Sequence, residues 1–134
     1  MALKRDKYDD VFSKLVRTQA NWCCEHPDCG KYFPPGPARR GLHCSHLFGR
    51  RRQSTRYDLD NAAALCYGHH QHFAEHPDKH HAFFLDRLGV EKYEALVKRA
   101  NKTKKWKAGE KEALYRNLKR ALELFDEPLR GRAS

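Results

Sequence analysis

Two pairs of metal-ligand residues stand out in the sequence. Cys24 and Cys29 are separated by four residues in a segment rich in glycine and proline, and Cys66 and His69 are separated by two. Thiolate and imidazole are the groups that structural zinc prefers, and two such pairs commonly complete a tetrahedral site. A cysteine and a histidine three apart on a helix face the same side and reach one ion. The sequence therefore predicts one structural Zn²⁺ held by these four residues.

Alternatives to this ligand set remain open. Cys23 lies next to the first pair and could replace its first member, with the less usual spacing of five residues. Without metal, Cys66 would be a small buried apolar residue and His69 would be exposed. Cys44 is expected to be a packed thiol. The odd number of cysteines, 5, argues against a disulfide scaffold.

A second group, His46, Asn61 and His70, could perform acid–base and metal chemistry. An imidazole with a pKa near 6.5 can accept a proton at neutral pH, and a neutral imidazole can bind a metal ion. His46 is expected at the end of a strand, and Asn61 and His70 are expected on one following helix. The remaining histidines of this region are expected to face solvent or DNA: His72, His76, His80 and His81.

Apolar periodicity and helix breakers predict the elements that position these residues. Apolar residues recur at helical spacing near the N-terminus, whereas the cysteine-rich segment has few apolar residues to hold it, which favours a metal. Asp58 or Asp60 is expected to cap the helix that begins near Asn61 and carries His70. Pro128 is expected to end the last helix. The expected order is a helix over 4–19, an irregular segment over 22–37, strands over 41–48 and 57–60, and helices over 61–74, around 83–88 and over 90–100. A last helix is expected to carry five apolar residues on one face: Leu114, Leu118, Ala121, Leu122 and Phe125.

Composition indicates the kind of partner. The 134 residues include 27 Lys plus Arg and 17 Asp plus Glu, a formal charge of +10, which favours a polyanion. The alternative is a basic surface that serves solubility alone. No apolar run approaches the length of a membrane span and no secretory h-region is present, so a cytoplasmic protein is expected.

Two segments carry a family resemblance. CSHL at residues 44–47 and DNAAALCYGHH at residues 60–70 resemble the motifs of HNH nucleases, whose ββα-metal fold is two short strands and a helix around one catalytic ion. The family usually has cysteine at the position of His69, and zinc accepts imidazole as well as thiolate. With DVFSKLVR at residues 10–17 and the Cys24–Cys29 segment, the resemblance extends to phage recombination nucleases of the NinG/Rap type and covers roughly residues 8–90.

The resemblance implies a role for three residues. His46 matches the general base that takes a proton from water, and Asn61 matches the residue that orients this base. His70 matches a ligand of the catalytic divalent ion, Mg²⁺ or Mn²⁺, which stabilises the charge on the leaving 3′-oxygen.

The other ligands of the catalytic ion are left open by the sequence. Ser45 stands where many HNH nucleases have a carboxylate or histidine ligand, and a hydroxyl binds a hard cation less well than a carboxylate. His43, Cys44 or Ser45 could contribute, or water and DNA phosphate could complete the shell.

Arginines near His46 are expected to contact DNA phosphates. Residues 102–107 could add backbone contacts and a stacking surface through Trp106, or this tryptophan could pack on the last helix instead. The arginines in question are Arg50, Arg51, Arg52 and Arg56, preceded by Arg39 and Arg40.

Together these features predict an α+β fold. A zinc-stapled HNH core with an N-terminal helix is expected over residues 1–90, and a basic helical extension packed on or beside it over residues 91–134. The expected function is metal-dependent hydrolysis of DNA phosphodiester bonds. The alternatives are a zinc-stapled DNA-binding module without activity, which Ser45 favours, and an RNA target. Both a monomer and a homodimer are compatible with the sequence.

Overall fold

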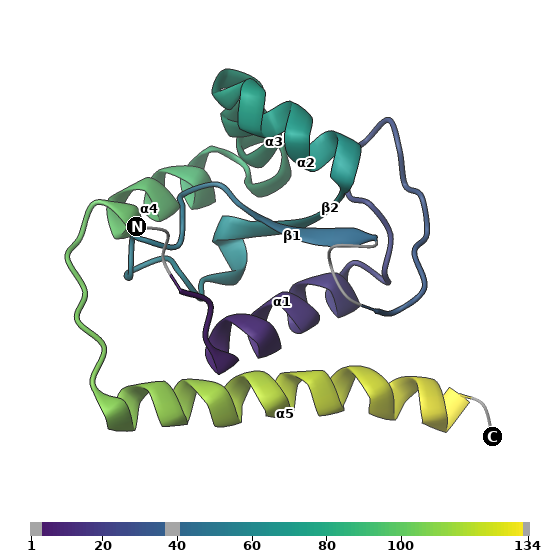
Figure 1. The fold of residues 1–134 in the computed structure, drawn as a ribbon, viewed down its shortest axis with the longest axis vertical. Coiled ribbons are helices and arrows are strands. Elements are labelled where there is room, and N and C mark those ends of the chain that lie inside the picture. The colour runs from purple at the N-terminus through teal and green to yellow at the C-terminus, as the bar shows by residue number, and fades with distance from the viewer. Residues whose placement is uncertain (1–3, 37–40, 133–134) are drawn as a thin grey trace.

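The computed structural model describes residues 4–36 and 41–132, and the fold is α+β (Figure 1). Helices α2 and α3 lie on one side of a small hairpin, and α1 and then α5 lie on the other (Figure 1). The elements in chain order are α1 (Lys7–Gln19), β1 (Leu42–His46), the 3-10 helix η2 (Leu59–Asn61), β2 (Ala62–Cys66), α2 (Tyr67–Glu75), α3 (Pro77–Leu88), α4 (Val90–Ala100) and α5 (Ala108–Arg132).

Helix α1 begins where its N-terminal cap dictates. The Asp6 side chain accepts a hydrogen bond from the backbone N–H of Asp9, and the Asp9 side chain accepts one from the backbone N–H of Asp6. This capping box satisfies two of the donors that a helix leaves unpaired at its start. The helix therefore begins at Lys7 rather than at residue 4, and buries Phe12 and Leu15 against the hairpin.

The hairpin corrects two sequence predictions. Residues 57–60 are not a strand: Tyr57 ends a turn, Asp58 is the N-terminal cap of η2, and residues 59–60 belong to η2. Residues 62–65 are not the start of a helix: they belong to β2, which pairs antiparallel with β1, Leu42 opposite Cys66 and His46 opposite Ala62. Alanine favours helices, but three consecutive buried alanines let helices approach both faces of the hairpin, and this packing outweighs local propensity.

The later helices follow the sequence predictions with two differences. Helix α2 begins at Tyr67 because Cys66 ends β2 and serves as the N-terminal cap. Gly89, with φ +83°, separates α3 from α4 as expected. Helix α5 does not end at Pro128 but runs to Arg132. Proline removes one backbone donor from a helix, and here the chain keeps its helical path.

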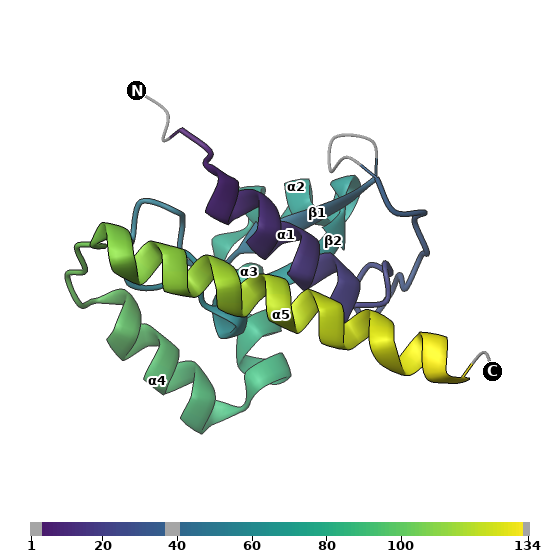
Figure 2. The ribbon, with the colours of Figure 1, turned by 90° about the horizontal axis from the view of Figure 1, so that it is seen from below.

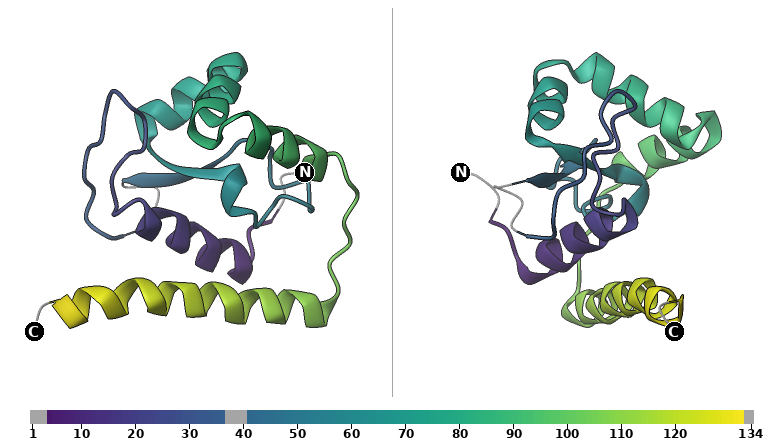
Figure 3. Two further views of the ribbon diagram at one scale, coloured as in Figure 1. Left: turned by 180° about the vertical axis from the view of Figure 1, so that it is seen from behind. Right: turned by 90° about the vertical axis from the view of Figure 1, so that its right-hand side faces the viewer.

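Two apolar clusters hold the layers together. The larger one joins α1, the hairpin, α2 and α5, and α5 contributes the buried Leu118 to it. The smaller one, Leu47, Ala63, Phe84 and Leu96, joins the hairpin to α3 and α4. Figure 2 shows α5 running along α1, and Figure 3 shows α4 on the side of the hairpin away from α5. Residues beyond 90 thus pack on the core as an extension of it.

No helix within residues 4–36 and 41–132 is both long and apolar enough to cross a membrane.

Candidate metal centre and the two faces of the hairpin

A tight loop presents the first two cysteines. The backbone N–H of Cys24 donates to the carbonyl of Lys31 at 2.9 Å, and that of Cys29 donates to the carbonyl of His26 at 3.0 Å. Gly30, with φ +70°, adopts the left-handed conformation that the turn after Cys29 requires and that glycine tolerates best. The loop therefore brings both thiols to the same side.

The junction of β2 and α2 presents the other two ligands. Cys66 lies at the N-terminal cap rather than inside the helix, and its sulfur accepts the backbone N–H of His69 at 3.5 Å. His69 lies in the first turn of α2. The strand-to-helix turn, rather than helical spacing alone, thus brings sulfur and imidazole together.

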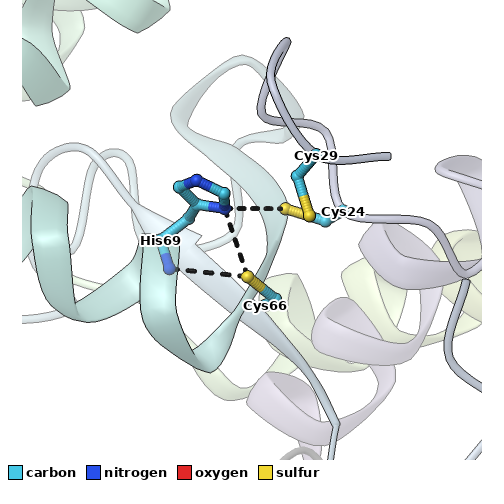
Figure 4. A group of neighbouring side chains, drawn as sticks. All are labelled: Cys24, Cys29, Cys66 and His69. Atoms are coloured by element: carbon cyan, nitrogen blue, oxygen red, sulfur yellow. Dashed lines mark hydrogen bonds between the residues drawn. The ribbon is translucent and has the colours of Figure 1, made fainter. Parts of the chain in front are cut away.

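Four ligand atoms converge between the loop and this junction, as Figure 4 shows. Those of Cys24, Cys29, Cys66 and His69 all lie within 4.8 Å of one another. His69 Nδ1 is 3.7 Å from Cys24 Sγ and 3.2 Å from Cys66 Sγ. Ligands of a tetrahedral zinc site are separated by about 3.4–3.8 Å, given Zn–S and Zn–N bonds of roughly 2.3 and 2.0 Å. The cluster can therefore hold a metal ion such as zinc.

The environment shifts the pKa values of the two loop thiols in opposite directions. Burial raises the pKa of Cys24 to about 11, whereas a hydrogen bond from the backbone of Lys31 lowers the pKa of Cys29. A metal binds thiolate, so loading the site releases a proton from Cys24 at neutral pH.

Two residues that the sequence analysis did not single out support the metal ligands. The Glu25 backbone N–H donates to the Ala64 carbonyl and its carboxylate accepts the Ala64 N–H, both at 2.8 Å, which ties the loop to β2. The carboxylate also pairs with Arg87 of α3. The His26 ring stacks on His69 with centroids 3.8 Å apart. Both residues lie between the two loop cysteines in the sequence, and this position was the signal that could have identified them.

One face of the hairpin gathers a second histidine cluster. Side chains alternate along a strand, so His43 and Ser45 share the face toward α2 and α3. The His43 and His70 rings are parallel, with centroids 5.3 Å apart, and Ser45 Oγ lies 3.2 Å from His80 Nε2. His43 Nε2 and His70 Nδ1 are buried and have no hydrogen-bond partner among the described residues.

Burial keeps this cluster uncharged at neutral pH. It lowers the pKa of His43 and His70, and it lowers that of His80 to about 4. Neutral imidazole is the form that binds a metal ion. The prediction that His80 faces solvent or DNA is wrong. Helix α3 folds back over the hairpin, and the His80 ring stacks on Phe73 with ring centroids 5.1 Å apart.

His46 lies on the opposite face, toward α1. Its ring packs near Phe12, with centroids 5.6 Å apart, and its Nε2 lies 3.1 Å from the Arg56 carbonyl, to which it donates in the corresponding tautomer. Burial lowers its pKa to about 4. The structure therefore brings His70 close to His43 and not to His46.

Asn61 fixes the loop between the strands. This fully buried amide accepts from the Phe48 N–H at 2.8 Å and donates to the carbonyls of Phe48 and Thr55 at 2.8 and 3.0 Å. The start of the loop, at Phe48, and its middle, at Thr55, are thus held to the last residue before β2.

The arginines that were expected to contact DNA differ in whether their guanidinium groups are already engaged inside the protein. Arg56 is buried, with Nη2 2.5 Å from the Asp9 carboxylate and Nε donating to its other oxygen, so the structure assigns it to the core rather than to a DNA surface. Arg50 also contacts Asp9, at 3.3 Å. The sequence has no acidic residue between Asp28 and Asp58, but α1 supplies one to Arg50 from more than 40 positions away. Arg39 and Arg40 lie outside the described residues.

Trp106 packs inward. Its indole N–H donates to the Gln53 carbonyl at 3.0 Å and its ring meets Tyr57 edge-on at 5.6 Å. This anchors the segment between α4 and α5 on the loop between the strands.

Comparison of the chain with models of protein families, with curated proteins and with solved structures gives no match. An assignment of function therefore depends on the residues and geometry of this chain. The likeness of residues 44–47 and 60–70 to HNH motifs stays a resemblance.

Proposed function

We propose that this chain is a metal-dependent HNH-type endonuclease that hydrolyses DNA, with β1, β2 and α2 as its ββα-metal core. The antiparallel hairpin followed directly by a helix supports the proposal. The observation that carries it is the pair of parallel rings of His43 and His70, each with a buried nitrogen that lacks a partner among the described residues. Unpaired buried polar groups are costly, and a cation bound by the two nitrogens in their unprotonated form would satisfy them.

The face toward α2 supplies the residues for a catalytic ion. His70 and His43 would bind it, with Ser45 and His80 beside them. A bound divalent ion would stabilise the negative charge on the phosphate and on the leaving 3′-oxygen. The ligand set contains imidazoles and no carboxylate, which suits Ni²⁺ or Zn²⁺ better than Mg²⁺ or Mn²⁺. Water and substrate would occupy the remaining positions.

His46 is the proposed general base. Because its Nε2–H is donated to the Arg56 carbonyl, the lone pair lies on Nδ1, which would accept the proton of the attacking water. The lowered pKa keeps the ring neutral, as this role requires, at the cost of weaker basicity. Asn61 would serve as a positioning residue, because it holds the loop that follows His46.

A second candidate is a zinc-stapled DNA-binding module without activity. The burial of His46 on the face toward α1, away from His70, favours it. Ser45 in place of a carboxylate ligand favours it as well. In this case the net charge of +10 and the Cys₃His cluster would retain their roles.

Cleavage assays separate the two candidates. Supercoiled plasmid and branched DNA are incubated with the zinc-loaded protein and Mg²⁺, Mn²⁺, Ni²⁺ or no added metal. We expect cleavage that requires added metal and that falls ~10²- to 10⁴-fold in His46→Ala. His70→Ala should need more metal for the same rate. The control His72→Ala, on the same helix, should cut normally.

Two outcomes of these assays would contradict the nuclease proposal. DNA binding without cleavage under any condition would select the inactive module. Cleavage by His46→Ala at the wild-type rate would remove His46 as the base and the HNH mechanism with it. Zinc content, measured for every variant, verifies that the Cys₃His cluster is intact.

A further inference from the structure

A basic pocket lies between two segments that are far apart in the sequence. It has a volume of about 340 Å³ and is formed by the loop between β1 and β2 and by the segment that follows α4. Four of its lining residues are cationic and none is acidic. The lining is Arg51, Arg52, Gln53, Ala100, Asn101, Lys102, Thr103 and Lys104.

Arg52 is held in place within this pocket. Its guanidinium carbon lies 5.1 Å from the centre of the Phe48 ring. Its Nη1 donates to the Ala100 carbonyl at 3.2 Å and to Asn101 Oδ1 at 3.1 Å. Both bonds use Nη1, so the edge formed by Nε and Nη2 is not needed for them. A guanidinium edge fixed in this way can form paired hydrogen bonds with a phosphate at little entropic cost.

Charges around the pocket leave a positive excess. The loop carboxylates of Asp58 and Asp60 pair with Arg99, at 2.7 and 3.3 Å. Lys104 pairs with Glu110 at 3.0 Å, while the neighbouring Lys102 is exposed to solvent. The carboxylates of Asp58 and Asp60 are therefore engaged outside the lining, Glu110 offsets only Lys104, and an anion would still meet cationic side chains.

We infer that this pocket binds a phosphate of a nucleic-acid backbone, away from the histidine face of the hairpin. The inference depends on the nucleic-acid partner of the proposed function but not on its cleavage. A polyanion is favoured over a small phosphorylated ligand because the chain carries a net charge of +10, which attracts extended phosphate backbones. Trp106, anchored on Gln53, holds the two basic segments side by side.

Salt-dependent binding of a labelled DNA duplex, measured by fluorescence anisotropy without added divalent ions, tests this inference. Lys102→Ala should weaken binding and lower the slope of log K against log salt by about one, the loss of one phosphate contact. Lys92→Ala, which removes an exposed lysine of α4, is the control with the same charge change and should have a smaller effect on both quantities.

Arg52→Lys keeps the charge but loses the paired hydrogen bonds, so it should weaken binding at every salt concentration. A thermal melt establishes that the variant is folded. Equal effects of Lys102→Ala and Lys92→Ala, together with unchanged binding by Arg52→Lys, would overturn the inference.

A titration with inorganic phosphate, followed by NMR, distinguishes a second source of the same chemistry. Shifts of the pocket resonances while Lys102→Ala binds DNA normally would indicate a small phosphorylated ligand and would also overturn it. Binding and cleavage are separate readouts: a protein that shows the expected binding losses but never cuts DNA supports this inference and contradicts the nuclease proposal.

Discussion

Neighbouring residues of α2, His69 and His70, belong to two clusters of different character. His69 completes a Cys₃His group whose four ligand atoms lie within 4.8 Å of one another, the single such group among the residues that the structure describes. His70 faces His43 instead, and this pair has unpaired nitrogens rather than a complete ligand set. A full tetrahedral set is typical of structural zinc, and a partial set leaves room for water or substrate.

The difference has a simple geometric origin. Successive residues of a helix point about 100° apart, so adjacent histidines face different neighbours. His69 points to the cysteine loop, whose position Glu25 and Arg87 secure. His70 points to the hairpin. One helix can thus carry a stabilising site and a candidate reactive site without shared ligands.

The largest effect on stability is expected at the Cys₃His group, which is a complete set of zinc ligands. Cys66→Ala removes a zinc ligand and the cap of α2, so zinc loss and a stability loss on the order of several kcal/mol should occur together. Metal analysis and thermal unfolding measure both. Cys23→Ala is the matched control, since its sulfur lies outside the group and bonds the Asn21 carbonyl. Zinc retained by Cys66→Ala at wild-type stability would contradict the assignment of this cluster.

The second-largest loss of stability is expected when Asn61 is replaced. Asn61→Ala leaves the backbone partners at Phe48 and Thr55 unpaired in the interior, which costs about 3 kcal/mol. Urea unfolding measures this loss, and zinc content should stay the same. Asn117→Ala, an exposed asparagine of α5, should change stability by less than about 0.5 kcal/mol. An equal effect of the two substitutions would mean that the loop does not depend on Asn61.

His46 should make the protein sensitive to acid. Its pKa is about 4 in the folded protein against 6.5 ordinarily, so the unfolded chain takes up the proton first as the pH falls. Stability that is complete above pH 6.5 is then lost down to pH 4, on the order of 3 kcal/mol. His46→Gln should show a shallower decline. Because zinc ligands titrate in both proteins, the difference between the two curves isolates His46, and parallel curves would contradict its burial.

The smallest expected effect concerns the incomplete cluster. His80→Ala should weaken binding of a second metal ion about 10-fold, a typical cost of losing a neighbour of the ligands. Zinc-loaded protein titrated with Co²⁺ or Ni²⁺, and followed by absorption spectroscopy or calorimetry, gives this affinity. His81→Ala, whose ring bonds the Tyr93 hydroxyl instead, is the control. Tight binding of one ion by wild type and none thereafter would show that this face does not hold metal.

Most helix positions and the first strand followed from local patterns, and the second strand did not. Apolar periodicity predicted α1 and α4 well, because a helix of this size satisfies its backbone within one segment. The residues of β2 were predicted as helix because alanine-rich segments favour one locally. Their actual backbone partners lie in β1, about 20 residues away, which no local pattern contains.

The sequence by itself identified the candidate metal ligands, with Cys23 left as an alternative to Cys24, and determined the positive net charge, because ligand type, spacing and charge are local properties. Only the tertiary structure decided which arginines meet solvent and which face each histidine occupies. Arg56 is neutralised by Asp9 of α1, and His43 and His46 are separated by the alternation of β1. These outcomes depend on partners distant in the chain, and burial gives such contacts their strength.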